Sequence, residues 1–447
     1  MQKKLIALFH AAMLVSAVAL LPATTAGLAA VEGRSGEQFG KLIAIYRLIK
    51  ENYVDEVEDD KLFKGAINGM LESLDPHSSY LDGPSLQRLE TMIDGSYSGL
   101  GLSVIMEEGA VKVISPFRGS PAEKAGVKAG DYITHLDGVL YFEGELDEAV
   151  AKMRGPAGTS IRLTIFRPGR TDDFDVTVVR GVIELEPVTS QLKDGVGVIS
   201  INEFSRDVGK DVNKAVKSLV KEAGGKLSGI VLDLRSNPGG SLDEAVALSD
   251  LFLEKGDIVS QRGRISSENE FFEAESLFPG DIARGTPIVV LIDAGSASAS
   301  EIVAGALQDH KRAVVMGERS FGKGSVQSLI GLDRESAIKL TTARYFTPSG
   351  HSVQEGGIEP DIRVPQLSDP DARLRAERAV RESDLRGHLI NEIGLDDKKL
   401  ETDKQDDPRF KLTAQELKDK GIEDFQLHYA IETLKRATSP ALAARRR

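Results

Sequence analysis

The feature that most constrains the fold is a long alternation of strand-like and helix-like segments between Pro187 and Val364. The strand-like runs are short, apolar and rich in β-branched residues, and they cover 196–201, 229–234, 288–292, 314–317 and 338–345. Between them, apolar residues recur with helical spacing over 242–253 and 300–307. Because this alternation is typical of strands covered by helices, it predicts an α/β layered core.

A segment with a different sequence pattern precedes this core. From Gly95 to Arg180, short β-rich runs are separated by glycine turns, at 102–105, 111–114, 161–166 and 174–179. Two predicted helices, 121–125 and 146–153, interrupt these runs. Residues 35–92 have helical periodicity, and the chain beyond Val364 is charged and mostly helical or loose. We expect its basic tail to be disordered.

The overall charge excludes one class of partner. The net charge is −13 at pH 7, whereas nucleic-acid binding needs a basic face. Hydrophobic residues make up 41% and charged residues 28%, which is ordinary for a globular protein with a real core. With 447 residues, two or three domains are expected.

The N-terminus has the three parts of a secretory signal. Lys3 and Lys4 precede the mostly apolar run Leu5 to Leu21, and small residues follow it. We expect cleavage after Ala26 or Ala30. The alternative is a retained single-span anchor, but the apolar run is shorter than the ~20 residues that a span needs.

The chain contains no cysteine. It therefore has neither a disulfide framework nor a thiolate metal site, and no cysteine that could carry a lipid anchor. An exported protein that is not lipidated is the resulting expectation.

A serine-rich turn, Gly295 to Glu301, comes at the start of a predicted helix, and Lys323 lies 25 positions beyond Ser298 between two glycines. A lysine can serve as the base for a serine nucleophile if burial lowers its pKa. This is the Ser-Lys variant of the catalytic triad, and it points to hydrolysis of acyl bonds. From chemistry alone, Ser296, Ser298 and Ser300 are equal candidates, and each could instead cap the helix.

Acyl transfer also needs donors for the developing oxyanion. The Ala299 N–H follows the middle serine and is one candidate. A Gly-Gly turn after the strand 229–234 exposes backbone N–H groups, so Gly239 or Gly240 is the second. The choice between the two glycines stays open.

These motifs resemble those of the carboxy-terminal processing peptidases, also called tail-specific proteases. The matching segments occur in the family's order across about 35–365, and they are 74–80, 232–240, 295–302, 321–327 and 345–362. The resemblance implies an α/β protease core, ClpP/crotonase-like, with a β-rich PDZ domain and helical segments at both ends. The implied organisation is a signal peptide at 1–30, a helical segment at 31–92, the PDZ domain at 93–180, the peptidase core at 181–365 and a C-terminal helical extension with a basic tail at 366–447.

The resemblance also assigns catalytic roles. Ser298 is the implied nucleophile, Lys323 the general base, and Gln327 the residue that orients the lysine; these two share a face if their stretch is helical. Asp309 is implied to hold the site together. His310 and His351 lie in the core and could in principle serve as a base, but neither sits in a motif with an orienting acid, and the family does not use one. No metal or other cofactor is expected.

Within the segment that resembles a PDZ domain, the carboxylate-binding loop is implied to contain Gly99, Leu100, Gly101 and Leu102. An incoming tail would then add as a strand beside 102–105. The apolar Leu100 and Leu102 predict a preference for apolar terminal residues. Arg154 is either a contact that gates the protease or a surface arginine at a helix C-terminus.

The expected function is therefore a periplasmic serine endopeptidase of a Gram-negative cell envelope that binds the C-terminal tails of protein substrates. The family also implies a homo-oligomer and allows a lipoprotein adaptor. Two alternatives belong to other classes: a proteolytically inactive PDZ protein that binds tails, and a crotonase-like acyl-CoA enzyme.

Overall fold

A computed structural model describes residues 34–437 except for 108, 118, 142–145, 185, 275–279, 334, 370–378, 392–409 and 411. The predicted signal peptide therefore lies outside the described residues, as does nearly all of the basic tail. Among the described helices, none is both long and apolar enough to cross a membrane. The chain forms two compact units, Met1–Leu86 with Gln327–Thr341, and Gln87–Val326 with Thr342–Arg447.

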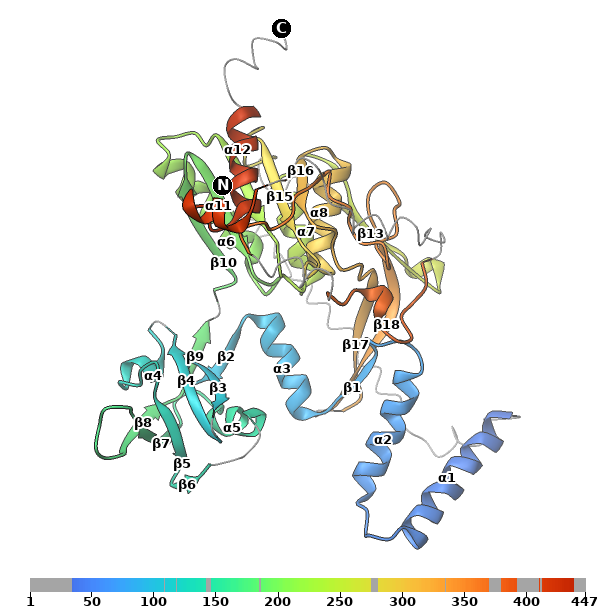
Figure 1. The fold of residues 1–447 in the computed structure, drawn as a ribbon. Helices are drawn as coiled ribbons and strands as arrows, with labels where there is room; N and C mark the ends of the chain where they lie inside the picture. The colour runs from blue at the N-terminus through green and yellow to red at the C-terminus, as the bar shows by residue number, and fades with distance from the viewer. Residues whose placement is uncertain are drawn as a thin grey trace, which may run out of the picture. The chain divides into compact units, whose positions relative to one another are not determined.

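The first unit is a helical hairpin joined to part of a β-hairpin (Figure 1). Its helices are α1 (Arg34–Asn52) and α2 (Asp59–Glu72), and Tyr46 stacks on Phe63 between them at 5.2 Å. The short strand β1 (Ser79–Leu81) pairs antiparallel with β18 (Ala337–Phe346), with Ser79 opposite Lys339. Strand β17 (Ser325–Gly331) pairs with β18 from the same hairpin.

The β-rich module, residues 95–184, contains a sheet of order β3-β4-β5-β7-β8, with β6 paired to β5. Its strands are β3 (Leu102–Glu107), β4 (Ala110–Pro116), β5 (Tyr132–Leu136), β6 (Val139–Leu140), β7 (Ser160–Phe166) and β8 (Phe174–Val179). Beside them lie α4 (Pro121–Lys124), α5 (Leu146–Met153) and the paired strands β2 (Ser96–Gly99) and β9 (Gly181–Glu184). Because β3 pairs only with β4 in the described sheet, one side of β3 is a free edge.

A six-stranded sheet forms the centre of the α/β core, in the order β10-β11-β12-β15-β16-β19. The strands are β10 (Val188–Lys193), β11 (Val196–Ile201), β12 (Gly229–Asp233), β15 (Ile288–Ile292), β16 (Ala313–Gly317) and β19 (Ile362–Arg363). Only β10 runs antiparallel to its neighbour; every other pair is parallel. The predicted α/β architecture is confirmed.

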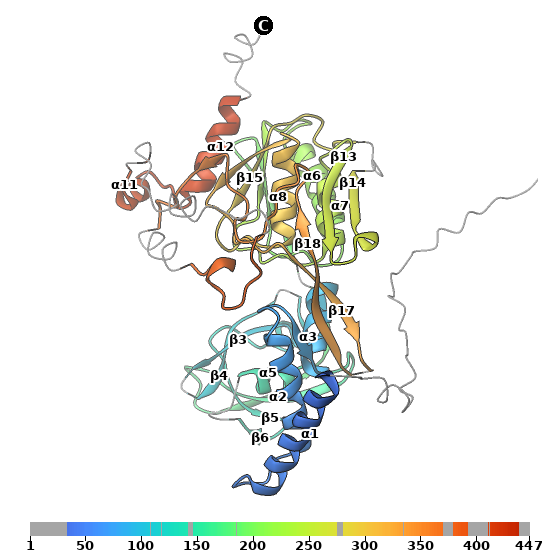
Figure 2. The same cartoon turned by 90° about the vertical axis from the view of Figure 1, so that its right-hand side faces the viewer.

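Helices cover both faces of this sheet because side chains alternate along each strand. Ile230 and Leu232 enter the core formed with α6 (Val208–Glu222), α7 (Leu242–Asp250) and α8 (Ala299–Asp309). Val231 enters the opposite core, with α11 (Ala414–Asp419) and α12 (Phe425–Ala437). Figure 2 shows α12 and α8 on opposite sides of β15. The C-terminal helices α11 and α12 therefore supply one of the two helical layers that cover this sheet.

The remaining elements of the second unit are α3 (Gly83–Asp94), β13 (Gly256–Gly263), β14 (Glu270–Ala274) and two 3₁₀ turns, Ser266–Glu268 and Glu382–Asp384. Strand β13 pairs antiparallel with β14 and with the end of β18, where Ser260 lies opposite Phe346. Several predicted bounds agree closely with these elements, while α6 and β17 were not predicted.

Candidate active site

The three serines of the turn before α8 differ in what their hydroxyl groups do. Ser296 is fully buried, and its hydroxyl donates to the Leu234 carbonyl at 2.8 Å and accepts from the Asp293 N–H. Ser300 is also fully buried, and its hydroxyl donates to the Asn237 carbonyl at 3.0 Å. The Ser298 hydroxyl donates to no residue in the described part of the chain, and Ser298 is 9% exposed. Of the three serines, only Ser298 therefore has a hydroxyl whose proton is not donated to another described residue.

Ser298 has a strained backbone, with φ 54° and ψ −112°. A positive φ is uncommon for a residue with a side chain, and such strain clusters at functional sites. Gly239 lies directly against this turn, because a Cβ at that position would be 2.8 Å from Ser298 Cβ and 2.8 Å from the Ala297 carbonyl oxygen. Position 239 therefore requires a glycine, because a side chain there would collide with the serine turn.

Two backbone amides at this contact are without a hydrogen-bond acceptor among the described residues: Ala299 N–H, at the first position of α8, and Gly240 N–H. The Gly239 N–H differs, since it donates to Asn237 Oδ1 at 2.9 Å. Asn237 also accepts the Ala297 N–H through its carbonyl at 3.0 Å, which ties the two turns together. Free amides at a helix start favour negative charge.

Glu301, which the sequence did not single out, connects the serine turn to the lysine loop. It is fully buried, and its Oε2 accepts both the Ser298 N–H at 2.7 Å and the Lys323 N–H at 3.0 Å. Its Oε1 accepts the Ser320 hydroxyl and the Gly322 N–H. Burial raises the pKa of Glu301 to about 7, although these four donors act in the opposite direction. One carboxyl oxygen thus holds the backbones of Ser298 and Lys323 close together.

Lys323 is half-buried in the loop before β17. Its flanking glycines permit a close approach to a neighbouring segment of the chain. A Cβ at Gly322 would lie 2.6 Å from the Glu355 carbonyl oxygen, and a Cβ at Gly324 would lie 2.5 Å from the Gln354 nitrogen. The glycines are therefore required by packing around the lysine.

Gln327 lies in strand β17, so the condition that its stretch be helical is not met. Lys323 lies in the loop before β17 and Gln327 lies in the strand itself, so the four-residue spacing between them does not place them on one helix face. The extended backbone of β17 is fixed by pairing with β18. The Gln327 side chain donates from Nε2 to Thr341 Oγ1 at 3.3 Å, within the first unit.

Asp309 and His310, which were also weighed from the sequence, have structural partners. Asp309, near the end of α8, accepts the Ser349 N–H at 2.9 Å. The His310 ring bonds to the Asp257 carbonyl at 2.7 Å, and His351 is exposed. The described residues contain no cluster of three His, Cys, Asp or Glu side chains suited to a metal ion.

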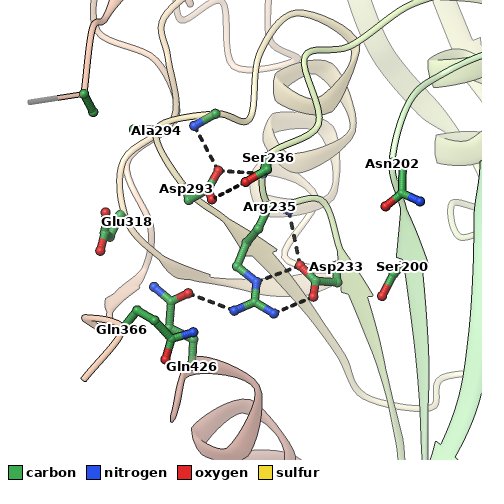
Figure 3. A pocket seen from close by; sticks show the side chains of 12 residues that line it. Ser200, Asn202, Asp233, Arg235, Ser236, Asp293, Ala294, Glu318, Gln366 and Gln426 are labelled. Carbon is green, nitrogen blue, oxygen red and sulfur yellow. Dashed lines mark hydrogen bonds and ion pairs between the residues drawn. The ribbon is translucent and has the colours of Figure 1, made fainter. Parts of the chain in front are cut away.

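An open cavity of about 520 Å³ lies at the carboxyl ends of β11, β12 and β15 (Figure 3). It is lined by Ser236 and Gly295, which lead into the two turns, but not by Ser298 itself. Arg235 crosses it, pairing with Asp233 at 2.6 Å and with Asp424 at 2.7 Å. Because Asp424 immediately precedes α12, the C-terminal segment anchors the start of the Gly-Gly turn.

The loop predicted to receive a carboxylate has a similar set of amides. The N–H groups of Leu100 and Gly101 have no acceptor among the described residues, whereas both carbonyls accept backbone bonds, from Ala122 and Phe117. Leu100 is buried in the core of the module. Arg154 lies with its guanidinium 4.9 Å from the Tyr97 ring, next to the loop, and its Nε is buried without a hydrogen-bond partner.

A serine at a strained turn before a helix, on an α/β core with a PDZ-like module, defines a serine endopeptidase. The family models agree: residues 195–364 match "Peptidase family S41", 113–167 match "PDZ domain", and 17–84 match "Activating protease CtpB N-terminal domain". The chain belongs to the S41 peptidases, among the carboxy-terminal processing proteases.

Individual relatives carry the same description. A carboxy-terminal-processing protease of Bartonella bacilliformis is 46% identical over 359 residues, which cover 80% of this chain and 82% of that protein. Carboxy-terminal processing protease CtpA of Bacillus subtilis is 37% identical, covering 73% and 69%. Among solved structures, a photosystem II D1 C-terminal processing protease has 27% identity and a TM-score of 0.44, covering 78% and 97%. The expected family, enzyme class and fold class are confirmed.

Proposed function

We propose that this carboxy-terminal processing protease cleaves its protein substrates with a Ser298–Lys323 dyad. The observation that carries the proposal is the distribution of hydroxyl bonds in the serine turn. The Ser296 and Ser300 hydroxyls donate to buried carbonyls, while the Ser298 hydroxyl donates to no described residue. The pairing of Ser298 with Lys323 is supported by Glu301, because its Oε2 accepts the backbone N–H of both residues.

In this mechanism the neutral Lys323 amine takes the proton from the Ser298 hydroxyl as its oxygen attacks the substrate carbonyl. The resulting ammonium then gives the proton to the leaving amine, and an acyl-enzyme forms. Water, deprotonated by the same amine, attacks the ester, and the ammonium returns this proton to the departing Ser298 oxygen as the acid is released. Gln327 orients the lysine amine during these transfers.

The oxyanion is stabilised by the N–H groups of Ala299 and Gly240 in this proposal. Both are without acceptors among the described residues, while the Gly239 N–H already donates to Asn237. Gly239 contributes by its missing side chain, which leaves room for the serine turn. Removing a donor of this kind typically costs ~10² to 10³ in kcat.

The β-rich module would receive the terminal carboxylate of the substrate at the amides of Leu100 and Gly101. The free edge of β3 is suited to pairing with the incoming tail as an added strand. Because Leu100 is buried, the half-buried Leu102 is the side chain available to select an apolar terminal residue.

Export to the periplasm and self-assembly complete the proposal. The N-terminal signal pattern supports export. Helices α1 and α2 support a homo-oligomer because several large apolar side chains on them are more than 40% exposed, namely Phe39, Leu42, Ile43, Ile45, Leu48, Phe63 and Met70. A lipoprotein adaptor and the five-segment domain division stay predictions.

Cleavage of an unstructured protein with an apolar C-terminus tests the dyad. Ser298→Ala and Lys323→Ala should each abolish cleavage, and mass spectrometry of quenched wild-type enzyme should find an acyl adduct on the peptide that contains Ser298. Ser300→Ala is the matched control, and it should keep the adduct on Ser298. An adduct on another serine, or cleavage by Ser298→Ala, would exclude the assignment.

A further inference from the structure

A segment far along the chain, residues 381–391, bonds to the lysine loop, residues 319–324, and has had no role so far. We call this segment the clasp. The Glu382 N–H donates to the Phe321 carbonyl at 3.2 Å, and the Arg381 guanidinium donates to the carbonyls of the two preceding loop residues at 3.3 and 3.1 Å. Both segments belong to the same compact unit. The clasp therefore holds the first half of the lysine loop by its backbone.

Gln354 joins the clasp to the other end of the loop. Its side chain is fully buried, and its Oε1 accepts the Gly324 N–H at 3.1 Å. Its Nε2 donates to Glu382 Oε1 and to the Leu389 carbonyl, both at 2.9 Å. Because a backbone N–H only donates and a carbonyl only accepts, these partners fix which end of the amide faces the loop. The clasp thus orients the acceptor for the residue that follows Lys323.

Glu355 holds the residue on the other side of the lysine. Its N–H donates to the Gly322 carbonyl at 2.9 Å, and its own backbone has a φ of 64°, which is uncommon for a residue with a side chain. Its carboxylate is held from the clasp, since Oε2 accepts the Asn391 N–H at 2.8 Å and Oε1 bonds to the His388 ring at 2.8 Å. The clasp therefore supports a strained backbone next to the lysine.

His388 is the clasp residue whose bonds depend on a proton. Its Nδ1 lies 2.8 Å from the Leu385 carbonyl, and its Nε2 lies 2.8 Å from Glu355 Oε1. A carbonyl and a carboxylate only accept, so both ring nitrogens donate, and only the imidazolium can do this. The Leu385 carbonyl and the charges of Glu355 and Glu382 raise the pKa of His388 above its ordinary 6.5, although burial opposes them. Both bonds are therefore present below this pKa, and one is lost as pH rises through it.

We propose that Gln354 and Glu355 are positioning residues that the clasp holds against the lysine loop, and that His388 closes the clasp while it is protonated. This inference rests on the proposed function, in which Lys323 is the base. The two glycines that flank Lys323 would otherwise allow its backbone many conformations. The clasp keeps that backbone in one of them.

The test measures hydrogen–deuterium exchange in the peptide 319–326 of the full-length protein, together with kcat and KM on a peptide with an apolar free C-terminus. His388→Phe keeps a ring but donates no hydrogen bond. It should speed exchange about 2- to 12-fold, the worth of one net hydrogen bond, and lower kcat by a similar factor with KM unchanged. Gln354→Met removes the acceptor for the Gly324 N–H and should have at least this effect.

The pH dependence provides a readout that a merely structural role would not move. The ratio of wild-type kcat to that of His388→Phe should be largest below about pH 6.5 and should approach one as pH rises through the raised pKa of His388. Wild-type exchange, corrected for the intrinsic effect of pH, should become faster over the same range. A ratio that does not change with pH would overturn the role of His388.

Two controls separate the clasp from general stability. His351→Phe makes the same substitution at an exposed histidine of the core and should match wild type. Exchange in the peptide 229–234, which contains β12, should be unchanged in every variant. Unchanged exchange at 319–326 in both His388→Phe and Gln354→Met would overturn the inference, as would faster exchange with wild-type kcat. Cleavage by Lys323→Ala would instead refute the proposed function, and faster loop exchange in the clasp variants would still support the clasp.

Discussion

The molecule has two turns in which a pair of backbone amides has no acceptor among the described residues, and the turns are held in different ways. At the serine turn, the residues next to Gly240 and Ala299 are held by buried side chains: the Gly239 N–H donates to Asn237 Oδ1 and the Ser298 N–H donates to Glu301 Oε2. At the loop of the β-rich module, Leu100 and Gly101 are held by backbone bonds to their carbonyls and by packing. The difference matches the proposed tasks, since an oxyanion needs donors fixed in advance, whereas a substrate tail can also pair with a strand edge.

The largest expected effect concerns Lys323, the proposed base. Lys323→Arg keeps a positive charge but cannot give up a proton near neutral pH. Turnover should fall by roughly 10⁴-fold or more, while binding of a tailed peptide, measured by fluorescence anisotropy, should be unchanged. Measurable turnover in this variant would remove Lys323 from the role of base.

Gly239→Ala tests how tightly the serine turn is held. The added methyl group would lie within 3.0 Å of atoms of Ala297, Ser298 and Ala299, at a φ of +102°. We expect kcat to fall ~10² to 10³-fold, with a loss of stability of about 1–3 kcal/mol. Gly225→Ala is the control, because Gly225 also has positive φ but open space around it. Equal kcat in the two variants would show that the close contact between Gly239 and the serine turn does not affect catalysis.

Glu301 gives the serine turn a pH-dependent stability. Its folded-state pKa of about 7 lies above the ordinary value of 4.5. The folded protein therefore binds more protons between these values, and the contribution is fully present below pH 4.5 and lost as pH rises through about 7. The loss should amount to about 3 kcal/mol.

Denaturant unfolding across this pH range measures the effect. Glu301→Gln should flatten the slope, whereas the exposed control Glu335→Gln should leave it intact. An unchanged slope in Glu301→Gln would assign the pH dependence to other groups.

The smallest expected effect concerns the second turn. A methyl group at Gly101 would lie 2.5 Å from Ser120 Cβ, so Gly101→Ala should displace the loop amides. We expect kcat/KM for a tailed peptide to fall about 10- to 100-fold, the worth of hydrogen bonds to a charged group. Amidating the peptide's terminus should have a similar effect in wild type and little in the variant. Gly119→Ala, which has open space, is the control.

Local patterns allowed much of the fold to be predicted. Strands β11 and β15 and helix α5 match their predicted ranges, because each is a short periodic or apolar run with clear ends. Helix α6 was missed although Val208, Val212, Val216 and Leu219 form a buried helical stripe. Its many lysines obscured a signal that was present in the sequence.

The missing parts of the site depend on contacts that are distant in sequence. The partners of Glu301 at Ser320, Gly322 and Lys323 are 19 to 22 positions away, so no local pattern marks this glutamate as buried. The bond from Arg235 to Asp424 spans 189 positions. Sequence spacing proposed the reacting groups, but it did not indicate the residues that hold them.

The buried carboxyl of Glu301 also bears on the order in which the chain becomes active during synthesis. A ribosome that has released residues up to 301 has not yet made the hydroxyl of Ser320 or the amides of Gly322 and Lys323. Without these donors, enclosing the carboxyl is strongly unfavourable. A nascent chain should therefore carry no peptide-cutting activity until the later loop emerges, which protects it and its neighbours from premature cleavage.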